Sequence, residues 1–275
     1  MQAANAAVLI PAPVQSPIDA ENCAEMRKIM HRFYVSPDRI AEDSVRITGP
    51  DVNHIKNVLR MRQGGEIIIC NGQGKDYYCI INTVSENEII AGIQSIQATG
   101  AELKARITLF QGLPKKDKME LVIQKAVELG VYEIVPVMTK RAVVKLEDKK
   151  KEEKKLERWQ SIAEEAAKQS GRGIIPRIRP VQAYQEAVEY ASSMDMGLIP
   201  YENAMGMQAT KDIMKELGQY NTIGVFIGPE GGFEESEIEF AQAKHIHPIT
   251  LGKRILRTET AGIAVLSMMV LMLEE

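Results

Sequence analysis

The sequence predicts an α/β protein in two parts, a small β-rich domain followed by a larger domain of alternating strands and helices. In residues 32–96, short apolar strands are separated by turn signals such as Asn71-Gly72, a spacing that is typical of a small barrel. After residues 98–101 the pattern changes, and apolar strands alternate with amphipathic helices. That alternation indicates a mostly parallel sheet with helices on both faces.

The first 29 residues differ from the rest of the chain. They contain Pro11, Pro13 and Pro17, few aromatic residues and no clear hydrophobic period. No basic region precedes their short apolar stretch, which argues against a secretory signal. A disordered extension at residues 1–29, or an upstream start, is expected.

The β-rich part is expected to contain one helix, at residues 51–61, where Val52, Ile55, Val58 and Leu59 share one side. Its strands are expected at residues 32–35, 44–47, 66–70, 77–84 and 88–96.

In the α/β part, the helix expected at residues 117–129 places Met119, Val122 and Ile123 on one face. The other expected helices are 156–169, 182–191, 235–244 and 261–273, and the expected strands are 105–111, 132–138, 195–199, 222–228 and 248–251.

Composition excludes several classes of protein. No apolar run reaches the roughly 18 residues of a membrane span. The three cysteines lack CxxC spacing, which argues against a disulfide framework and a structural zinc site and fits a reducing cytoplasm. Cys70 and Cys79 alternate with apolar neighbours and are expected in the core.

Charge is unevenly distributed although the net charge is only −3. Residues 102–182 are rich in Lys and Arg, whereas residues 183–275 carry an excess of Asp and Glu. Such asymmetry suggests a surface that faces a polyanion, but a solvated Lys/Glu helix in the same region would also explain it.

Two motifs late in the chain carry the strongest functional signal. Residues 227–233 read Ile-Gly-Pro-Glu-Gly-Gly-Phe, a tight turn whose glycines let the backbone approach a ligand closely. Residues 251–261 read as a short strand, a polar turn and the start of an apolar helix. Two such loops, each after an expected strand, suggest a ligand that is held largely by backbone groups.

Each motif also has a purely structural interpretation, and both interpretations can hold together. The glycine turn precedes an acidic helix, where Glu234, Glu235 and Glu237 are favoured by the helix dipole. In the second motif, Thr258 or Thr260 is a candidate N-cap, with Glu259 in the first turn.

Other common site signatures are absent from the sequence. No GxGxxG follows the first strand of the α/β part, and GxxxxGK[ST] does not occur, which disfavours an ordinary Rossmann site and a P-loop. The lack of Gly-x-Ser-x-Gly disfavours a hydrolase with a nucleophile elbow.

From about residue 30 to residue 275, the chain resembles the RsmE-type ribosomal RNA uridine-N3 methyltransferases of the SPOUT superfamily. The resemblance rests on the two late motifs, the start at residues 30–35, the run from His54 to Arg60, the Glu-Leu-Gly of residues 128–130, and Gln-Ser-Gly-Arg at residues 169–172. It implies a PUA-like RNA-binding domain at residues 30–98 and a SPOUT domain with a deep trefoil knot at residues 104–275. It also implies a cytoplasmic homodimer.

The activity implied by the resemblance is transfer of a methyl group from S-adenosyl-L-methionine to N3 of a uridine in 16S rRNA of the small ribosomal subunit, without a metal. Three late loops would bind the cofactor through backbone groups, with Leu198, Ile227, Leu251 and Leu256 as apolar walls. Matched position by position, the cofactor-binding residues are Leu198, Pro200, Tyr201, Ile227, Gly228, Pro229, Glu230, Gly231, Gly232, Leu251, Gly252, Ile255, Leu256 and Arg257.

The reaction needs loss of the imide proton and attack of N3 on the sulfonium methyl, because the neutral nitrogen has no free lone pair. Arg257 is the candidate for stabilising negative charge on the base or for orienting a phosphate. Glu259 or Glu202 would act as the base or would position Arg257, and spacing does not distinguish them.

RNA contacts are expected in both domains. Lys115, Lys116 and Lys118 open a helix, where positive charge is unfavourable against the dipole, so contact with RNA phosphates is the functional explanation. For the lysines the structural alternative is a solvated loop. For the arginines and histidine named next it is a surface charge or a histidine with satisfied hydrogen bonds, and for Arg172 it is a helix end capped by Gly171. The other candidates for RNA binding are Arg32, His54, Arg60, Arg62 and Arg172.

Two other functions remain open. SPOUT ribose 2′-O-methyltransferases share the glycine loop, but their last motif reads Ser-Leu-Asn-Val-Ser, whereas residues 255–260 here read Ile-Leu-Arg-Thr-Glu-Thr. A non-catalytic RNA-binding protein is the second alternative, and the intact glycines and the Arg257/Glu259 pair argue against it.

Overall fold

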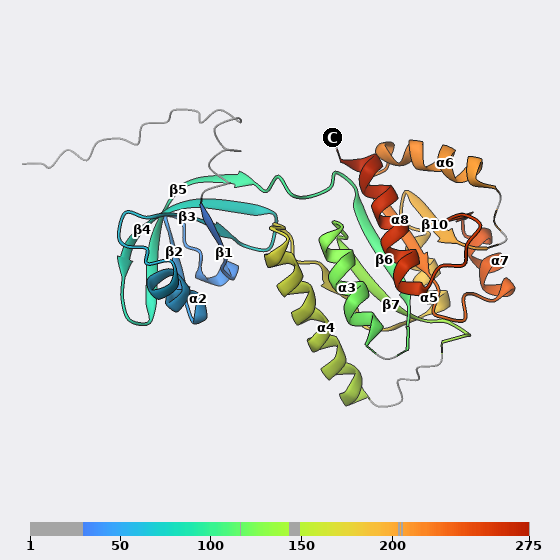
Figure 1. The fold of residues 1–275 in the computed structure, drawn as a ribbon, viewed down its shortest axis with the longest axis horizontal. Coiled ribbons are helices and arrows are strands. Elements are labelled where there is room, and N and C mark those ends of the chain that lie inside the picture. The colour runs from blue at the N-terminus through green and yellow to red at the C-terminus, as the bar shows by residue number, and fades with distance from the viewer. Residues whose placement is uncertain (1–29, 116, 143–148, 203, 205, 275) are drawn as a thin grey trace, which may run out of the picture. The chain divides into compact units, whose positions relative to one another are not determined.

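The computed structural model describes residues 30–115, 117–142, 149–202, 204 and 206–274 (Figure 1). The extension expected at residues 1–29 lies outside these residues, as do Cys23 and Lys116. Across the described ranges, no helix is long and apolar enough to cross a membrane.

The N-terminal part is a five-stranded sheet in the order β1-β3-β4-β5-β2, so β1 and β2 stand at its two ends and the sheet forms an open half-barrel. Register shifts between β4 and β5 mark irregularities of the kind that bend a strand. This is the small β domain expected from the strand spacing. Its elements are β1 (His31–Tyr34), η1 (Pro37–Arg39), β2 (Ser44–Thr48), β3 (Glu66–Cys70), β4 (Lys75–Val84) and β5 (Glu88–Ala98).

The helix expected at residues 51–61 is shorter and of mixed type. It begins as α2 (Pro50–Asn53) and continues as the π-helical turn η2 (His54–Val58). Ile55 is fully buried in the core of this domain, so the expected apolar face is present. Arg60 follows with a positive φ of 54°, which ends the helix.

The C-terminal part is a seven-stranded sheet in the order β12-β10-β11-β6-β7-β8, with β9 paired to β7. The paired strands of this sheet are parallel throughout. Its strands are β6 (Arg106–Gly112), β7 (Glu133–Met138), β8 (Arg177–Ile178), β9 (Gln182–Ala183), β10 (Met196–Pro200), β11 (Thr222–Ile227) and β12 (Ile246–Ile249).

Helices cover both faces of this sheet, as the sequence predicts (Figure 1). In β6, Ile107 and Leu109 join one core with α3, α4 and α8, whereas Phe110 joins a second core with α5 and α7. This alternation follows the two-residue period of a strand. The helices are α3 (Lys118–Glu128), α4 (Lys149–Gln169), α5 (Tyr184–Ala191), α6 (Met207–Glu216), η3 (Leu217–Gln219), α7 (Glu235–Ala243) and α8 (Thr258–Leu273).

The structure differs from the expected elements where the apolar signal is weak. Helix α6 was not expected, and within it only Thr210 and Met214 are buried. Strand β12 begins at Ile246, two residues before the expected position, directly after His245 with its positive φ of 61°. Its Pro248 is tolerated because β12 is an edge strand. Strand order does not test the trefoil knot, which stays a prediction.

Candidate functional site

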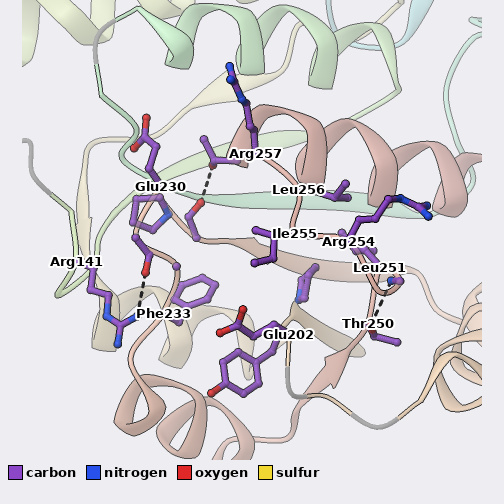
Figure 2. Close-up of a pocket in the computed structure, with 18 of the residues that line it drawn as sticks. Arg141, Glu202, Glu230, Phe233, Thr250, Leu251, Arg254, Ile255, Leu256 and Arg257 are labelled. Atoms are coloured by element: carbon purple, nitrogen blue, oxygen red, sulfur yellow. Dashed lines mark hydrogen bonds between the residues drawn. The ribbon is translucent and has the colours of Figure 1, made fainter.

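A pocket of about 640 Å³ lies where the neighbouring parallel strands β11, β10 and β12 end (Figure 2). Its walls come from the segments that follow these strands, at residues 200–202, 228–233 and 250–258, with Lys118 and Arg141 from elsewhere. Ligands of parallel α/β sheets bind outside the carboxyl ends of the strands, and the volume is in the usual range for small molecules.

All expected cofactor residues line this pocket except Leu198 and Ile227. These two side chains are 0% and 2% exposed and belong to the apolar core of the sheet. The expectation that they form pocket walls is therefore wrong, because side chains within buried strands point into the core layers beside the sheet and not along the strand toward its end.

The turn after β11 depends on close backbone approach. Gly232 has a φ of +66° and its N–H donates to the carbonyl of Pro229 at 2.9 Å. A Cβ on Gly112, at the end of β6, would lie 2.6 Å from Cδ of Pro229 and 2.8 Å from its nitrogen. The guanidinium of Arg141 donates to the carbonyl of Gly231 at 3.0 Å, so the turn is held from both sides.

The acidic residues after this turn serve the start of α7, as the structural interpretation predicts. The backbone N–H of Glu234 donates to the Glu237 carboxylate at 2.8 Å, and the N–H of Lys140 donates to its other oxygen at 2.9 Å. In the second motif, Glu259 lies in the first turn of α8 as expected, but the N-cap position is held by Arg257 without a side-chain cap, so the expected cap at Thr258 or Thr260 is wrong.

Thr258 instead ties the two motifs together. Its hydroxyl donates to the carbonyl of Gly228 at 2.6 Å and accepts from Nε2 of Gln111 at 2.9 Å. Thr258 is 5% exposed and Gln111 is fully buried. Neither role was predicted, because the contact joins residues 147 positions apart. A buried polar residue at the end of an apolar strand, as Gln111 is, was the only sequence signal for it.

Lys118 forms a charged cluster with two carboxylates at the pocket. Its ammonium lies 3.1 Å from Oε1 of Glu230 and 3.3 Å from Oε2 of Glu259. The backbone N–H of Lys115 also donates to the Glu230 carboxylate, at 3.1 and 3.2 Å. The helix start that the sequence assigned to RNA phosphates is thus occupied, in the described residues, by acidic side chains of the site.

The cluster shifts the pKa values of Lys118 and Glu230 toward their charged forms. The contact with the Glu230 carboxylate, followed by the ion pair with Glu259, raises the pKa of Lys118. Desolvation acts to raise the pKa of Glu230, but hydrogen bonds from its own backbone, Lys118 and Lys115 outweigh it and lower that pKa. The buried Oε2 of Glu259 receives no well-formed hydrogen bond from the described residues, so its close neighbour is the Lys118 ammonium.

The three candidate catalytic residues are not joined to one another. Figure 2 shows Arg257 and Glu202 on different sides of the pocket, with the Arg257 side chain pointing away from Glu202. Both residues are exposed, and within the described ranges no ion pair connects Arg257 to Glu202 or Glu259. The idea that a carboxylate positions Arg257 finds no support in this geometry.

Arg172 is placed unlike a residue that contacts RNA. Its side chain is 3% exposed and forms an ion pair with Glu102, and it also donates to the carbonyls of Val127 and Val131. A buried guanidinium with these partners has a structural role, so the expected RNA contact of Arg172 is wrong.

The remaining candidates for RNA binding differ in their side-chain contacts and exposure. Arg32 donates to Asp76 at 2.6 and 3.2 Å. His54 is exposed and its ring lies edge-on to Phe33, with centroids 6.1 Å apart. Arg60 and Arg62 are exposed, as is Lys115, whereas Lys116 lies outside the described residues.

The two described cysteines lie in the core and not at the pocket. Cys70 and Cys79 are free and buried, which confirms their expected place in the core. Burial raises the pKa of Cys79 to about 12. No cluster of three or more metal-ligating side chains occurs in the part of the chain that the structure describes.

Comparison with known proteins defines the class. A family profile described as an RNA methyltransferase domain matches residues 101–270, and one described as an RNA methyltransferase PUA domain matches residues 47–94. The chain therefore belongs to the RNA methyltransferase family in which these two domains occur together.

Relatives narrow the comparison further. Ribosomal RNA small subunit methyltransferase E of Bacillus subtilis (strain 168) is 36% identical over 86% of this chain and 95% of its own. The protein of that name from Mesomycoplasma hyopneumoniae is 37% identical over 86% and 98%. The crystal structure of a ribosomal RNA small subunit methyltransferase E from Neisseria gonorrhoeae bound to S-adenosyl methionine is 34% identical, with a TM-score of 0.73 over 87% and 96%.

Proposed function

We propose that this protein transfers a methyl group from S-adenosyl-L-methionine to N3 of a uridine in 16S rRNA of the small ribosomal subunit. The observation that carries this proposal is the pocket at the ends of β10, β11 and β12, in a chain that aligns over most of its length with small-subunit rRNA methyltransferases. We further propose that it works as a homodimer in the cytoplasm.

The pocket fits S-adenosyl-L-methionine in size and in the chemistry of its walls. The glycine turn presents backbone groups, and a Cβ on Gly228 would lie only 3.1 Å from Cα of Gly232. Leu251 and Leu256 are partly buried beside it and provide apolar surface. When bound, this cofactor supplies an electrophilic methyl group on a sulfonium centre.

The residues of the pocket meet the remaining needs of N3 methylation. Arg257 is exposed at the pocket, so its guanidinium can stabilise negative charge that develops on the oxygens of the base. Glu202 lines the pocket with an exposed carboxylate, which favours it as proton acceptor over Glu259, whose carboxylate is held beside Lys118. A uridine must leave its stack to expose N3.

N3 is favoured over the ribose 2′-oxygen by the last motif. Residues 255–260 lack the Ser-Leu-Asn-Val-Ser pattern of ribose methyltransferases, and an arginine stands at position 257. Arginine suits an imide anion, which the ribose reaction does not form.

The test is methyl transfer from labelled S-adenosylmethionine to small ribosomal subunits from cells that lack this protein, followed by mass spectrometry of the nucleosides. We expect 3-methyluridine with the wild type, a loss of product in Arg257→Ala, and normal product in Lys215→Ala, a control at a surface position on α6. Glu202→Gln and Glu259→Gln compare the two candidate bases.

Two outcomes would contradict the proposal. A 2′-O-methylated nucleoside would assign the protein to the ribose class. No transfer, together with no binding of S-adenosylmethionine by calorimetry, would leave an RNA-binding protein without this activity.

A further inference from the structure

Ile255, one of the residues that line the pocket, is far more exposed than its apolar neighbours. Ile255 is 88% exposed, more than any other exposed large apolar side chain in the described residues. Its neighbours in the same loop, Leu251 and Leu256, are partly buried against the protein. Ile255 also lines the pocket, but it lacks this support, so most of its side chain is free to contact a partner other than a cofactor held by the pocket walls.

The loop that carries this exposed apolar side chain also carries three cations. Lys253, Arg254 and Arg257 are all exposed, and no ion pair or hydrogen bond links their side chains to another residue in the ranges that the structure describes. Figure 2 shows Arg254 and Arg257 extending in different directions from the loop that carries Ile255.

This combination matches the chemistry of an unstacked nucleotide. A base that has left its helix presents an apolar face to protein side chains, and isoleucine is among the residues that proteins insert beside or between bases. The phosphates on either side of that nucleotide are anionic and suit exposed lysine and arginine. A small-molecule cofactor would offer one compact partner and would leave the outward cations unused.

We infer that Ile255 packs against the face of the target base in single-stranded RNA, while Lys253 and Arg254 bind the flanking phosphates. This inference rests on the proposed function, and it moves Ile255 from the expected cofactor-binding set to recognition of the RNA. Arg257 remains the residue that acts on the base itself.

The test compares Ile255→Ala with Leu256→Ala, its partly buried neighbour, in two separate measurements. Calorimetry gives the Kd for S-adenosylmethionine, and steady-state methyl transfer gives kcat/KM for small ribosomal subunits. Ile255→Ala is expected to leave the Kd within about twofold of the wild type and to lower kcat/KM about tenfold, the factor expected for one lost apolar contact. Leu256→Ala is expected to weaken cofactor binding, and Ile255→Leu is expected to recover most of the activity.

Phosphate contact has a separate signature. Arg254→Ala is expected to weaken binding to a single-stranded uridine-rich RNA oligonucleotide and to reduce the dependence of that binding on salt. Ile255→Ala is expected to weaken the same binding with an unchanged salt dependence. Fluorescence anisotropy measures both.

Several results would overturn the inference. A weaker Kd for S-adenosylmethionine in Ile255→Ala with normal RNA binding would return Ile255 to the cofactor wall, and no effect on either partner would remove it from recognition altogether. If the wild type transfers no methyl group but its binding to the oligonucleotide depends on Ile255, the proposed function fails and the RNA contact stands.

Discussion

The hydrogen bonds of Thr258 are expected to hold the glycine turn after β11 against the end of β6 and the start of α8, and Thr258→Val tests this directly. Valine has nearly the same shape but lacks the hydroxyl, so the carbonyl of Gly228 loses a donor at 2.6 Å. Nε2 of Gln111 loses an acceptor but keeps its bond to the carbonyl of Gly112 at 2.9 Å. The net change is therefore chiefly one unsatisfied, partly buried carbonyl.

Leaving such a group without a partner costs about 1–3 kcal/mol, and the partial exposure of Gly228 favours the lower half of that range. A loss of about 1–2 kcal/mol corresponds to a fall in Tm of roughly 2–8 °C for a domain of this size. Because the freed carbonyl belongs to the glycine turn, S-adenosylmethionine should also bind more weakly. Differential scanning fluorimetry and calorimetry measure the two effects.

Thr258→Ser is the matched control, since it keeps the hydroxyl and removes one methyl group, worth about 0.8 kcal/mol. Stability should fall in the order wild type, serine variant, valine variant. A valine variant with the Tm of the wild type would refute the reasoning. A serine variant as unstable as the valine variant would show that methyl packing, and not the hydrogen bond, stabilises this junction.

Two further predictions concern the same loops. Gly112→Ala should lower both Tm and cofactor affinity, because its Cβ would lie 2.8 Å from the backbone nitrogen of Pro229 and 2.6 Å from its ring Cδ. Gly218→Ala is the control and should change neither quantity, because nothing lies within 4 Å of its Cβ. Equal effects in the two variants would contradict this prediction. Lys118→Met should raise the pKa of Glu230 by removing one of the hydrogen bonds that lower it. A carboxyl group whose pKa is lowered in the folded state stabilises the fold above its unfolded-state pKa, and this stabilisation is lost as pH falls through its folded-state pKa. The difference in Tm between wild type and Lys118→Met should therefore narrow below pH 4.5, the unshifted pKa of Glu230. Thermal melts from pH 7 to pH 3 measure it, with Lys118→Arg as the control, and a difference independent of pH would contradict the assignment.

The local hydrophobic pattern predicted much of the fold because the apolar residues of each strand show which of its side chains are buried. In β6 the alternation of Ile107, Leu109 and Phe110 across two cores gives both the strand and the two helical layers. The glycine turn was found for the same reason, since its tight geometry depends on residues 228–232 themselves. Features of this kind need no knowledge of which strands are neighbours.

The contacts that organise the site depend on sheet order, which the sequence does not contain. Thr258 reaches Gly228 and Gln111 only because β11 lies between β6 and β10 in the sheet. Leu198 and Ile227 were assigned to the pocket wall by the sequence, although their side chains lie in the core. Apolar residues just before a loop look the same in sequence whether they line the pocket or fill the core, and here they fill the core.

Charge gives the clearest case of a pattern whose meaning depends on pairing. The basic excess of residues 102–182 suggested a surface that faces a polyanion, yet two of the cations that the sequence assigned to RNA there, Lys118 and Arg172, pair with carboxylates of the chain. Exposed cations at the pocket, Lys253 and Arg254 among them, come instead from the segment with an acidic excess. A bound RNA experiences the charges that remain unpaired near it, not the average of a segment. Neutralising Arg254 should therefore weaken RNA binding more than neutralising Arg158, which is exposed but already paired with Glu120.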